Sequence, residues 1–256
     1  MRVLVLLSGG QDSTTVLFMA LAAGHEVVAL SIDYGQRHVA ELAAARKVVD
    51  IALEHYGERM SAHASVELPR DVLRSLSPLV SNQPLEQYSD FHSLPGGVEK
   101  TFVPLRNQLF LTIAANYAVH YGCEEIHIGV SQEDYGGYPD CRAEFLGHLQ
   151  EAIDWGLLGV TSVAIRSPLL HLSKAATVLR AFNLKPCWEA MAYTHTAYDG
   201  RYPPTGKDHA SLLRAKGFFE AGLPDPLVVR AVTEGLMQPP ETSNYDALRP
   251  HNHPIS

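Results

Sequence analysis

The sequence is poor in cysteine, in positive charge and in long apolar runs. The 256 residues include three cysteines, Cys123, Cys141 and Cys187, an odd and sparse set that excludes a disulfide framework and fits a reducing cytosol. Lys plus Arg number 20 against 28 Asp plus Glu, a formal charge of -8, which argues against a protein whose main task is to hold a nucleic acid backbone. The first apolar run, Val3–Leu7, is too short to span a bilayer. We therefore expect a cytoplasmic protein without membrane or nucleic acid partners.

Short apolar segments alternate with helical patterns over residues 1–182. Apolar runs that end at glycines are typical of buried parallel strands, and this alternation predicts an α/β nucleotide-binding domain on a doubly wound parallel sheet. Residues 183–256 predict a C-terminal extension packed on that domain, with one helix near Ser211–Ala221. The irregular stretch Arg70–Lys100 is interpreted as an insertion or a loop over a site. The expected strands are Val3–Leu7, His25–Ile32, Ser61–Leu68, Glu125–Val130 and Val160–Ile165, and the expected helices are Asp12–Ala23, Val39–Tyr56, Asn107–Tyr121, Ala143–Leu157 and Ser173–Phe182.

The loop after the first predicted strand carries the strongest chemical signal. Its glycines let backbone N–H groups approach an anion, and the start of the following helix adds positive potential. In an open parallel sheet, ligands bind at the carboxyl ends of the strands, where this loop lies. Asp12 can hold a Mg²⁺ ion on the phosphates, whereas the alternative is a plain turn in which Asp12 or Ser13 caps the helix. The predicted phosphate-binding residues are Ser8, Gly9, Gly10, Gln11, Asp12, Ser13, Thr14 and Thr15.

Other polar residues follow the predicted strands or open the predicted helices. Asp33 is placed for a ribose or adenine contact, or it is a turn residue at a strand end. Arg37 and Arg106 offer planar forks for carboxylate or phosphate, or they form surface ion pairs. Asn107 is interpreted as a possible helix cap. Lys174 near a helix start is placed to neutralise charge on the α-phosphate, or it is a solvated lysine.

A later segment combines acidic and aromatic residues. Glu133, Asp134 and Asp140 form an acidic cluster that suits Mg²⁺, or the amine and ring N–H groups of a purine-like base. Tyr135 and Tyr138 are expected either to stack on such a base or to pack in the core.

These motifs resemble a known family. The loop over residues 8–13 reads Ser-Gly-Gly-x-Asp-Ser, without the Walker or dinucleotide spacing, and resembles the loop of the PP-loop ATP pyrophosphatases, which cleave ATP between the α and β phosphates. To about Gly222 the chain is similar to the 7-cyano-7-deazaguanine synthase family of queuosine precursor synthesis. The stretches that carry this resemblance are Asp33–His38, Pro104–Asn107, Gly129–Arg142 and Ser167–Leu169 with Lys174.

The resemblance implies an ATP- and Mg²⁺-dependent carbon–nitrogen ligase. Such an enzyme adenylates the carboxylate of 7-carboxy-7-deazaguanine and uses ammonia to form the amide and then the nitrile, 7-cyano-7-deazaguanine (preQ0). The resemblance also implies a homodimer. The implied catalytic residues are Asp12, Ser13, Arg106 and Lys174, and Asp33 and Gly129 join the phosphate loop in binding the nucleotide. The implied substrate contacts are Tyr34, Gln36, Arg37, Arg106, Asn107, Glu133, Asp134, Tyr135, Tyr138 and Asp140.

The sequence departs from the family at a zinc site. The family closes with four zinc-binding cysteines, and Cys187 matches the first of them. The other three positions hold Thr205, Asp208 and Ser211. Hydroxyl groups are poor zinc ligands, so we expect a tail without zinc that packing and hydrogen bonds hold in place. The alternative is a rebuilt site in which His195 and His209 help Cys187 and Asp208.

A second departure, Leu105 where the family usually has glycine, predicts a reshaped substrate pocket and a divergent branch. One rival function is therefore a related ligase that joins the deazaguanine acid to an amine of a protein partner, as in antiviral deazaguanine conjugation. A rival of another class is a non-catalytic nucleotide-binding module, which the intact loop and acidic cluster disfavour. Enzymes of transfer RNA thiolation or lysidine formation share this loop. The sequence lacks a Cys-x-x-Cys pair and a basic tail, which argues against both functions.

Overall fold

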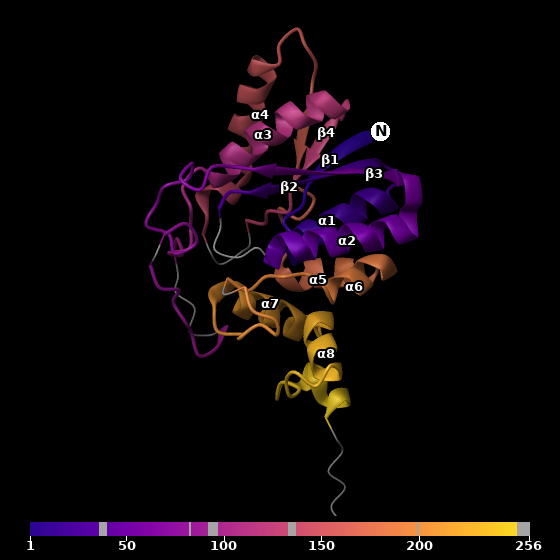
Figure 1. Cartoon of the computed structure of the whole chain (residues 1–256), viewed down its shortest axis with the longest axis vertical. Coiled ribbons are helices and arrows are strands. Elements are labelled where there is room, and N and C mark those ends of the chain that lie inside the picture. The colour runs from indigo at the N-terminus through magenta and orange to yellow at the C-terminus, as the bar shows by residue number, and fades with distance from the viewer. Residues whose placement is uncertain (36–39, 82, 92–96, 133–136, 199, 250–256) are drawn as a thin grey trace, which may run out of the picture.

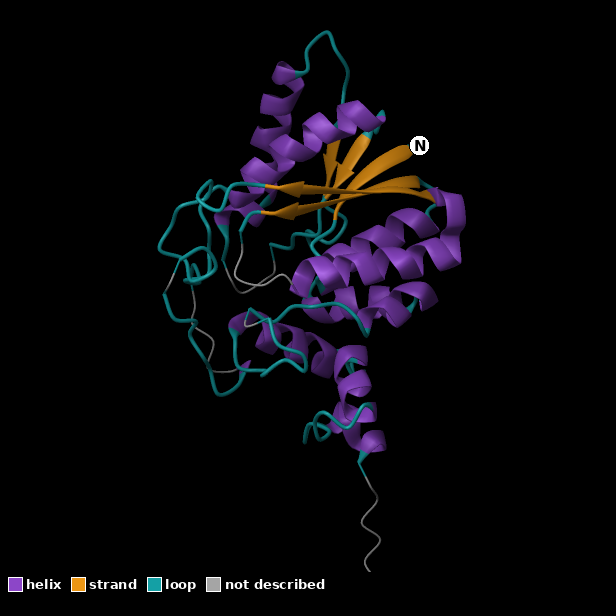
Figure 2. Ribbon diagram, in the orientation of Figure 1, coloured by secondary structure: helices purple, strands orange, loops and turns teal. Residues whose placement is uncertain are grey.

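The computed structural model of the chain describes residues 1–35, 40–81, 83–91, 97–132, 137–198 and 200–249. A parallel five-stranded sheet lies between two layers of helices (Figures 1 and 2). The strand order is β3-β2-β1-β4-β5, which confirms the predicted doubly wound sheet. The strands are β1 Arg2–Leu6, β2 Glu26–Asp33, β3 Met60–Glu67, β4 Glu125–His127 and β5 Ala164–Arg166.

Helices cover both faces of this sheet (Figure 1). Helices α3 (Arg106–Tyr121) and α4 (Ala143–Gly156) lie on one face, and α1 (Gln11–Ala22) and α2 (Ala40–Tyr56) lie on the other. Helices α5 and α6 pack against that second pair from outside, and α7 and α8 extend beyond them. Their bounds are α5 Lys174–Phe182, α6 Lys185–Met191, α7 His209–Glu220 and α8 Pro226–Thr233, with 3₁₀ turns η1 at Gly57–Arg59, η3 at Pro139–Cys141 and η4 at Ser243–Leu248. Among the described residues, no helix is both long and apolar enough to cross a membrane.

The central strand explains why the sheet is buried on both faces. Side chains of a strand point alternately to its two sides. Val3 and Val5 of β1 belong to the core cluster that contains α1 and α2, whereas Leu4 and Leu6 belong to the cluster that contains α3. A continuous apolar run is therefore needed to fill both layers, as the sequence pattern predicted.

Two sequence predictions about the later strands are wrong in extent. The strand expected over Val160–Ile165 begins only at Ala164, because Gly159 forms a turn at φ +78° and the Val160 side chain is 72% exposed. Strand β4 ends at His127 rather than Val130, since the chain then turns toward the loop after β1. An apolar run alone did not distinguish strand from turn at either place.

The prediction of one helix after residue 183 is also wrong, because the extension contains α6, α7 and α8. Pro186 and Pro226 lie in the first turns of α6 and α8, where proline is compatible with a helix because the first N–H groups have no partner within it. Proline is also common in irregular chain, so the sequence pattern around these two residues did not indicate helices. Cys187, Ala190 and Met191 of α6 share one core cluster with β1 and α1, and the domain division at residue 182 stays a prediction.

Candidate active site

The loop after β1 lies at the point where the strand order reverses, between β1 and β4. Gly9 has φ +85°, and a Cβ atom there would lie 2.3 Å from the backbone oxygen of Glu41 on α2. A Cβ atom on Gly129, after β4, would lie 2.9 Å from the backbone nitrogen of Ser13. Glycine is therefore required at both positions, because helices α1 and α2 approach the loop backbone too closely for a side chain.

Hydroxyl groups organise this loop. The Ser8 and Ser13 Oγ atoms lie 3.0 Å apart, and the Gly10 backbone N–H donates to Ser8 Oγ at 3.2 Å. The N-cap residue of α1 is Gly10, without a side-chain cap, so the alternative in which Asp12 or Ser13 caps the helix is wrong. Thr14 and Thr15 are fully buried, and Thr15 Oγ1 donates to the Gln11 carbonyl at 2.9 Å. Thr15 thus bonds within its own helix, whereas the buried Thr14 Oγ1 has no hydrogen-bond partner among the described residues, and nucleotide contacts of these two threonines stay predictions.

Asp12 and Lys174 form an ion pair beside the loop. Lys174 begins α5, and its Nζ lies 2.7 Å from Asp12 Oδ2. The structure thus brings together two residues that the resemblance implied were catalytic. Asp12 Oδ1 and Gln11 Nε2 are buried and have no hydrogen-bond partner among the described residues, and such atoms are costly unless a ligand meets them. A free carboxylate oxygen suits Mg²⁺, which proteins often hold with one or two carboxylates plus phosphate and water.

Two adjoining cavities open beside the loop. The polar cavity, of about 310 Å³, is lined by Gly10, Gln11, Asp12 and Lys174 among others. The apolar cavity, of about 300 Å³, is lined by Leu6, Leu30, Ile32, Phe110 and Ile128 at the carboxyl ends of the strands and on α3. The residues that line both are Ser8, Ser13, Glu41, Arg106, Gly129, Ser131, Tyr138, Cys141 and Tyr198. A polar and an apolar ligand portion can therefore meet at these shared residues.

Arg106 and Glu41 bring opposite charges to this meeting point. The Arg106 guanidinium donates to the Tyr34 hydroxyl at 3.3 Å and lies 5.9 Å from the centre of the Tyr34 ring. Burial raises the pKa of Tyr34, although Arg106 opposes the rise. Burial also raises the pKa of Glu41 to about 7, again against the effect of Arg106.

Asp140 holds the start of α3 instead of lining a cavity. Its Oδ2 accepts from the Asn107 backbone N–H at 3.2 Å, and its carbonyl accepts from Asn107 Nδ2 at 3.2 Å. Burial raises the pKa of Asp140, while the Asn107 N–H opposes the rise. The structure thus gives Asp140 a role in holding α3, and a substrate contact through Asp140 stays a prediction. Asn107 does not cap α3, because the N-cap residue is Leu105, but it does line the apolar cavity.

The remaining predicted residues divide into three groups. Tyr34 and Tyr138 line the apolar cavity, and the Tyr138 hydroxyl lies 2.6 Å from Thr101 Oγ1. Asp33 is outside both linings and accepts from the Gly35 N–H at 2.9 Å, as a turn residue does, and its ribose contact stays a prediction. Gln36, Arg37, Glu133, Asp134 and Tyr135 lie outside the described residues.

Leu105, which stands where the family usually has glycine, is the N-cap residue of α3. Its backbone adopts φ +61°, the left-handed conformation that glycine favours, and its side chain is 61% exposed and outside both linings. The Leu105 side chain therefore lies outside both cavities.

The positions of the family's cysteines are satisfied by other contacts. Asp208 caps α7, because its Oδ1 accepts from the Ser211 N–H at 3.0 Å and its Oδ2 accepts from Ser211 Oγ at 2.6 Å. Cys187 is fully buried in the core, and burial raises the pKa of its thiol far above the ordinary value. His195 Nε2 lies 2.9 Å from the Ala197 carbonyl oxygen. No group of three or more metal-binding side chains occurs in the part of the chain that the structure describes.

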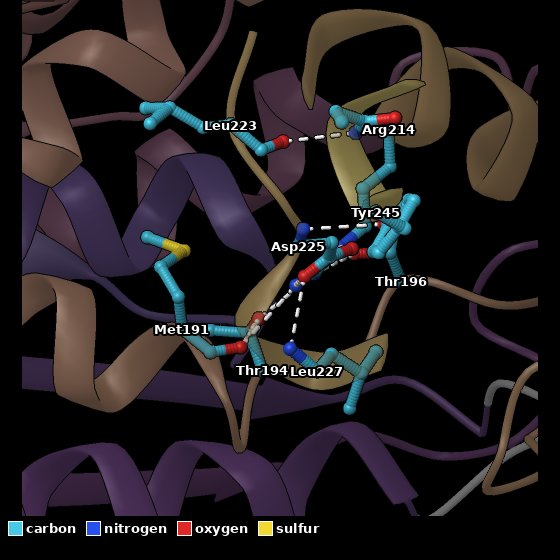
Figure 3. Close-up of polar contacts among 9 residues, drawn as sticks. Met191, Thr194, Thr196, Arg214, Leu223, Asp225, Leu227 and Tyr245 are labelled. Atoms are coloured by element: carbon cyan, nitrogen blue, oxygen red, sulfur yellow. Dashed lines mark hydrogen bonds and ion pairs between the residues drawn. The ribbon is translucent and has the colours of Figure 1, made fainter. Parts of the chain in front are cut away.

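A buried arginine joins the extension to the site (Figure 3). Arg214 on α7 donates from Nε and Nη2 to the two oxygens of Asp225 at 2.6 and 2.9 Å. Its Nη1 donates to Thr194 Oγ1 at 2.8 Å and Thr196 Oγ1 at 3.0 Å. Between these threonines, the His195 N–H donates to the Gly9 carbonyl at 2.9 Å. The arginine therefore fixes residues 194–196 against the phosphate loop.

Sequence reasoning missed Glu41, Tyr198 and the segment 194–196 as parts of the site. Tyr198 follows no strand and belongs to no recognisable motif, and Glu41 reaches the site only because α2 packs on Gly9. One signal was available for Glu41. The Asp33–His38 stretch, which was singled out, leads directly into the helix that carries it.

A parallel sheet of this order, with a Ser-Gly-Gly-x-Asp-Ser loop at its switch point, defines a PP-loop α/β protein of the ATP pyrophosphatase type. A family model described as queuosine biosynthesis protein QueC matches residues 2–222, and the chain belongs to that family. The resemblance seen in the sequence is thereby confirmed.

Named relatives cover most of the chain. A 7-cyano-7-deazaguanine synthase of Gloeobacter violaceus is 42% identical over 229 residues, which are 88% of this chain and 95% of the relative. The synthase of Chromobacterium violaceum is 44% identical over 240 residues, covering 91% and 95%. Among solved structures, a 4-thiouridine synthetase–RNA complex with bound ATP has a TM-score of 0.46 at 16% identity, over 92% of this chain and 53% of that one. That likeness is too distant to inform on ligands.

Proposed function

We propose that the protein is an ATP-dependent ligase that converts 7-carboxy-7-deazaguanine, with ammonia, into the amide and then into 7-cyano-7-deazaguanine. The named relatives are synthases of this nitrile. The observation that carries the proposal is the junction of the two cavities at Arg106, beside the phosphate loop. One cavity offers glycine N–H groups and Lys174, and the other offers an apolar slot with aromatic walls, which suit a triphosphate and a flat ring system.

The chemistry follows from the poor reactivity of a carboxylate, whose oxygen is a bad leaving group. Transfer of AMP to that oxygen creates a good leaving group, and ammonia then displaces AMP to form the amide. A second adenylation, on the amide oxygen, allows that oxygen to leave as well and the nitrile to form. In this scheme the phosphate loop holds the departing pyrophosphate, and Lys174 and Arg106 stabilise charge on the transferring phosphate. Mg²⁺ bound at Asp12 Oδ1 would neutralise charge on the pyrophosphate.

Product analysis tests this proposal. The purified protein is incubated with ATP, Mg²⁺, ammonium and the deazaguanine acid, and the products are identified by mass spectrometry. We expect the nitrile together with AMP and pyrophosphate. Asp12→Asn removes the charge that pairs with Lys174 and is expected to lower pyrophosphate release at least about 100-fold, if charge stabilisation in the transition state is its role. Asp50→Asn on the exposed face of α2 is the matched control.

Other products would favour the rival functions. If the reaction stops at the amide, or if an adduct forms on an added protein amine, the protein is a conjugating ligase rather than a nitrile synthase. Binding of ATP without any release of AMP would identify a nucleotide-binding module instead. The homodimer stays a prediction, which sedimentation of the purified chain would measure.

A further inference from the structure

Glu41 is the single carboxylate among the described residues that line both cavities. It lies in the first turn of α2, whose backbone touches Gly9 of the phosphate loop. Arg106, from α3, is the single guanidinium in the same set. If AMP is transferred to an acid in this site, the reacting atoms must lie where the two cavities meet, and therefore beside this carboxylate.

The Glu41 carboxylate has no hydrogen bond or ion pair with any residue that the structure describes. Arg106 uses one of its donors on Tyr34 and forms no ion pair within the same part of the chain. The other titratable groups that line the apolar cavity are the hydroxyls of Tyr34, Tyr138 and Tyr198 and the thiol of Cys141. A partly buried carboxylate that faces a cavity without a partner is disposed to receive a cation or an N–H donor from a ligand.

The proposed reaction requires such a cation. Ammonia in neutral water is mostly ammonium, which has no lone pair and cannot attack a carbonyl carbon. The site must therefore bind a small cation and remove a proton from it next to the acyl adenylate. A base is most effective when its pKa lies near the working pH, and burial brings the pKa of Glu41 to about 7.

We propose that Glu41 binds ammonium at the junction of the two cavities and accepts the proton whose removal makes ammonia nucleophilic. This inference rests on the proposed function. One N–H bond of ammonium breaks, and its proton moves to a Glu41 carboxylate oxygen. The nitrogen lone pair then forms the C–N bond, while the C–O bond to AMP breaks and AMP leaves with the electron pair. The second surplus proton of the nitrogen passes to water, as does the proton on Glu41 before the next turnover.

The experiment separates adenylation from amide formation. Exchange of labelled pyrophosphate into ATP, in the presence of the acid and without ammonium, reports adenylation alone. Amide formation is measured with ammonium at pH 7 and at pH 9, where free ammonia is more abundant. Glu41→Gln is compared with Glu54→Gln, the same change at an exposed position of α2.

We expect Glu41→Gln to lower amide formation at pH 7 by roughly 100-fold or more, the usual loss when a general base is removed, and to lower exchange by less than about tenfold. The KM for ammonium should rise, and the deficit should shrink at pH 9. Glu54→Gln should match the unaltered protein in both assays. Should Glu41→Gln fail to fold, Glu41→Asp keeps the proton acceptor at shorter reach, and it should retain exchange and part of the amide formation.

Two results would overturn the assignment. A parallel loss of exchange and amide formation, with a raised KM for the acid, would show that Glu41 binds the base edge of the substrate. Unchanged amide formation at pH 7 would show that Glu41 has no role. The absence of exchange in the unaltered protein would instead contradict the proposed function itself.

Discussion

Replacing Arg214 by methionine removes the cation that joins α7, α8 and the segment 194–196. The side chains of Arg214 and Asp225 are each 4% exposed, so their ion pair is shielded from water. Methionine fills similar space but offers no donors. The Asp225 carboxylate would then keep only the Leu227 N–H as a hydrogen-bond donor, at 3.0 Å, and would stand in a dry environment without its cation.

The magnitude follows from this geometry. Removing one partner of a buried ion pair costs about 3–5 kcal/mol, and the remaining Leu227 N–H favours the lower part, about 3–4 kcal/mol. For a chain of 256 residues, each kcal/mol lowers the melting temperature by roughly 2–4 °C, so the expected loss is roughly 6–16 °C.

Thermal and urea unfolding of Arg214→Met, Asp225→Asn and the double variant form the assay. The two residues contact each other directly, so the double variant should be more stable than the sum of the single effects by about 2 kcal/mol. Below the melting transition, Arg214→Met should also raise the KM for ATP, because the His195 N–H loses its fixed position on Gly9. A melting temperature within about 2 °C of the unaltered protein would contradict the reasoning, since that shift corresponds to roughly 1 kcal/mol or less.

Three other changes have definite expectations. Leu105→Gly should raise the free energy of unfolding by about 0.5–1 kcal/mol, because the relief of left-handed backbone strain exceeds the cost of the extra conformational entropy that glycine gives the unfolded chain. Thermal unfolding measures this change, and a lower melting temperature for the variant would contradict the prediction. Glu41→Gln should stabilise the protein by roughly 2–3 kcal/mol at pH 8 but little at pH 5. Burial raises the pKa of Glu41 from 4.5 to about 7, so the stability gained from its protonation is complete below pH 4.5 and is lost as the pH rises through 7. Urea unfolding of both proteins at pH 5 and pH 8 measures the difference in their free energies of unfolding, and a variant that is no more stable at pH 8 would contradict the prediction. Gly9→Ala should lower the free energy of unfolding by about 3 kcal/mol or more, because the added Cβ atom would meet the Glu41 carbonyl. Gly24 has a similar φ but open space around it, so Gly24→Ala should lower the free energy of unfolding by only about 1–2 kcal/mol. Equal losses of stability in the two variants would show that backbone strain alone matters.

The parts of the fold that depend on local patterns could be predicted from the sequence. The alternating burial of Val3 and Leu4 follows from a continuous apolar run, and the close approach at Gly9 follows from glycine chemistry at the end of a strand. The helices that begin near Pro186 and Pro226 were missed, because proline also marks irregular chain.

The parts of the site that depend on tertiary packing could not be predicted in this way. Asp12 and Lys174 are 162 positions apart, and only the family resemblance linked them before the structure did. Tyr198 reaches the cavities because the preceding segment is fixed by Arg214, which no local pattern reveals. For Leu105, the substitution was visible in the sequence, but its outward direction depends on the backbone at the start of α3.

Oxygen labelling tests the central claim, adenylation of a carboxylate at the phosphate loop. The deazaguanine acid is prepared with heavy oxygen at both carboxylate positions and incubated with the protein, ATP, Mg²⁺ and ammonium, and the AMP is examined by mass spectrometry. The proposed path places both heavy oxygens in AMP, one for each adenylation, as the nitrile accumulates. AMP without heavy oxygen, or heavy oxygen found only in inorganic phosphate, would contradict it.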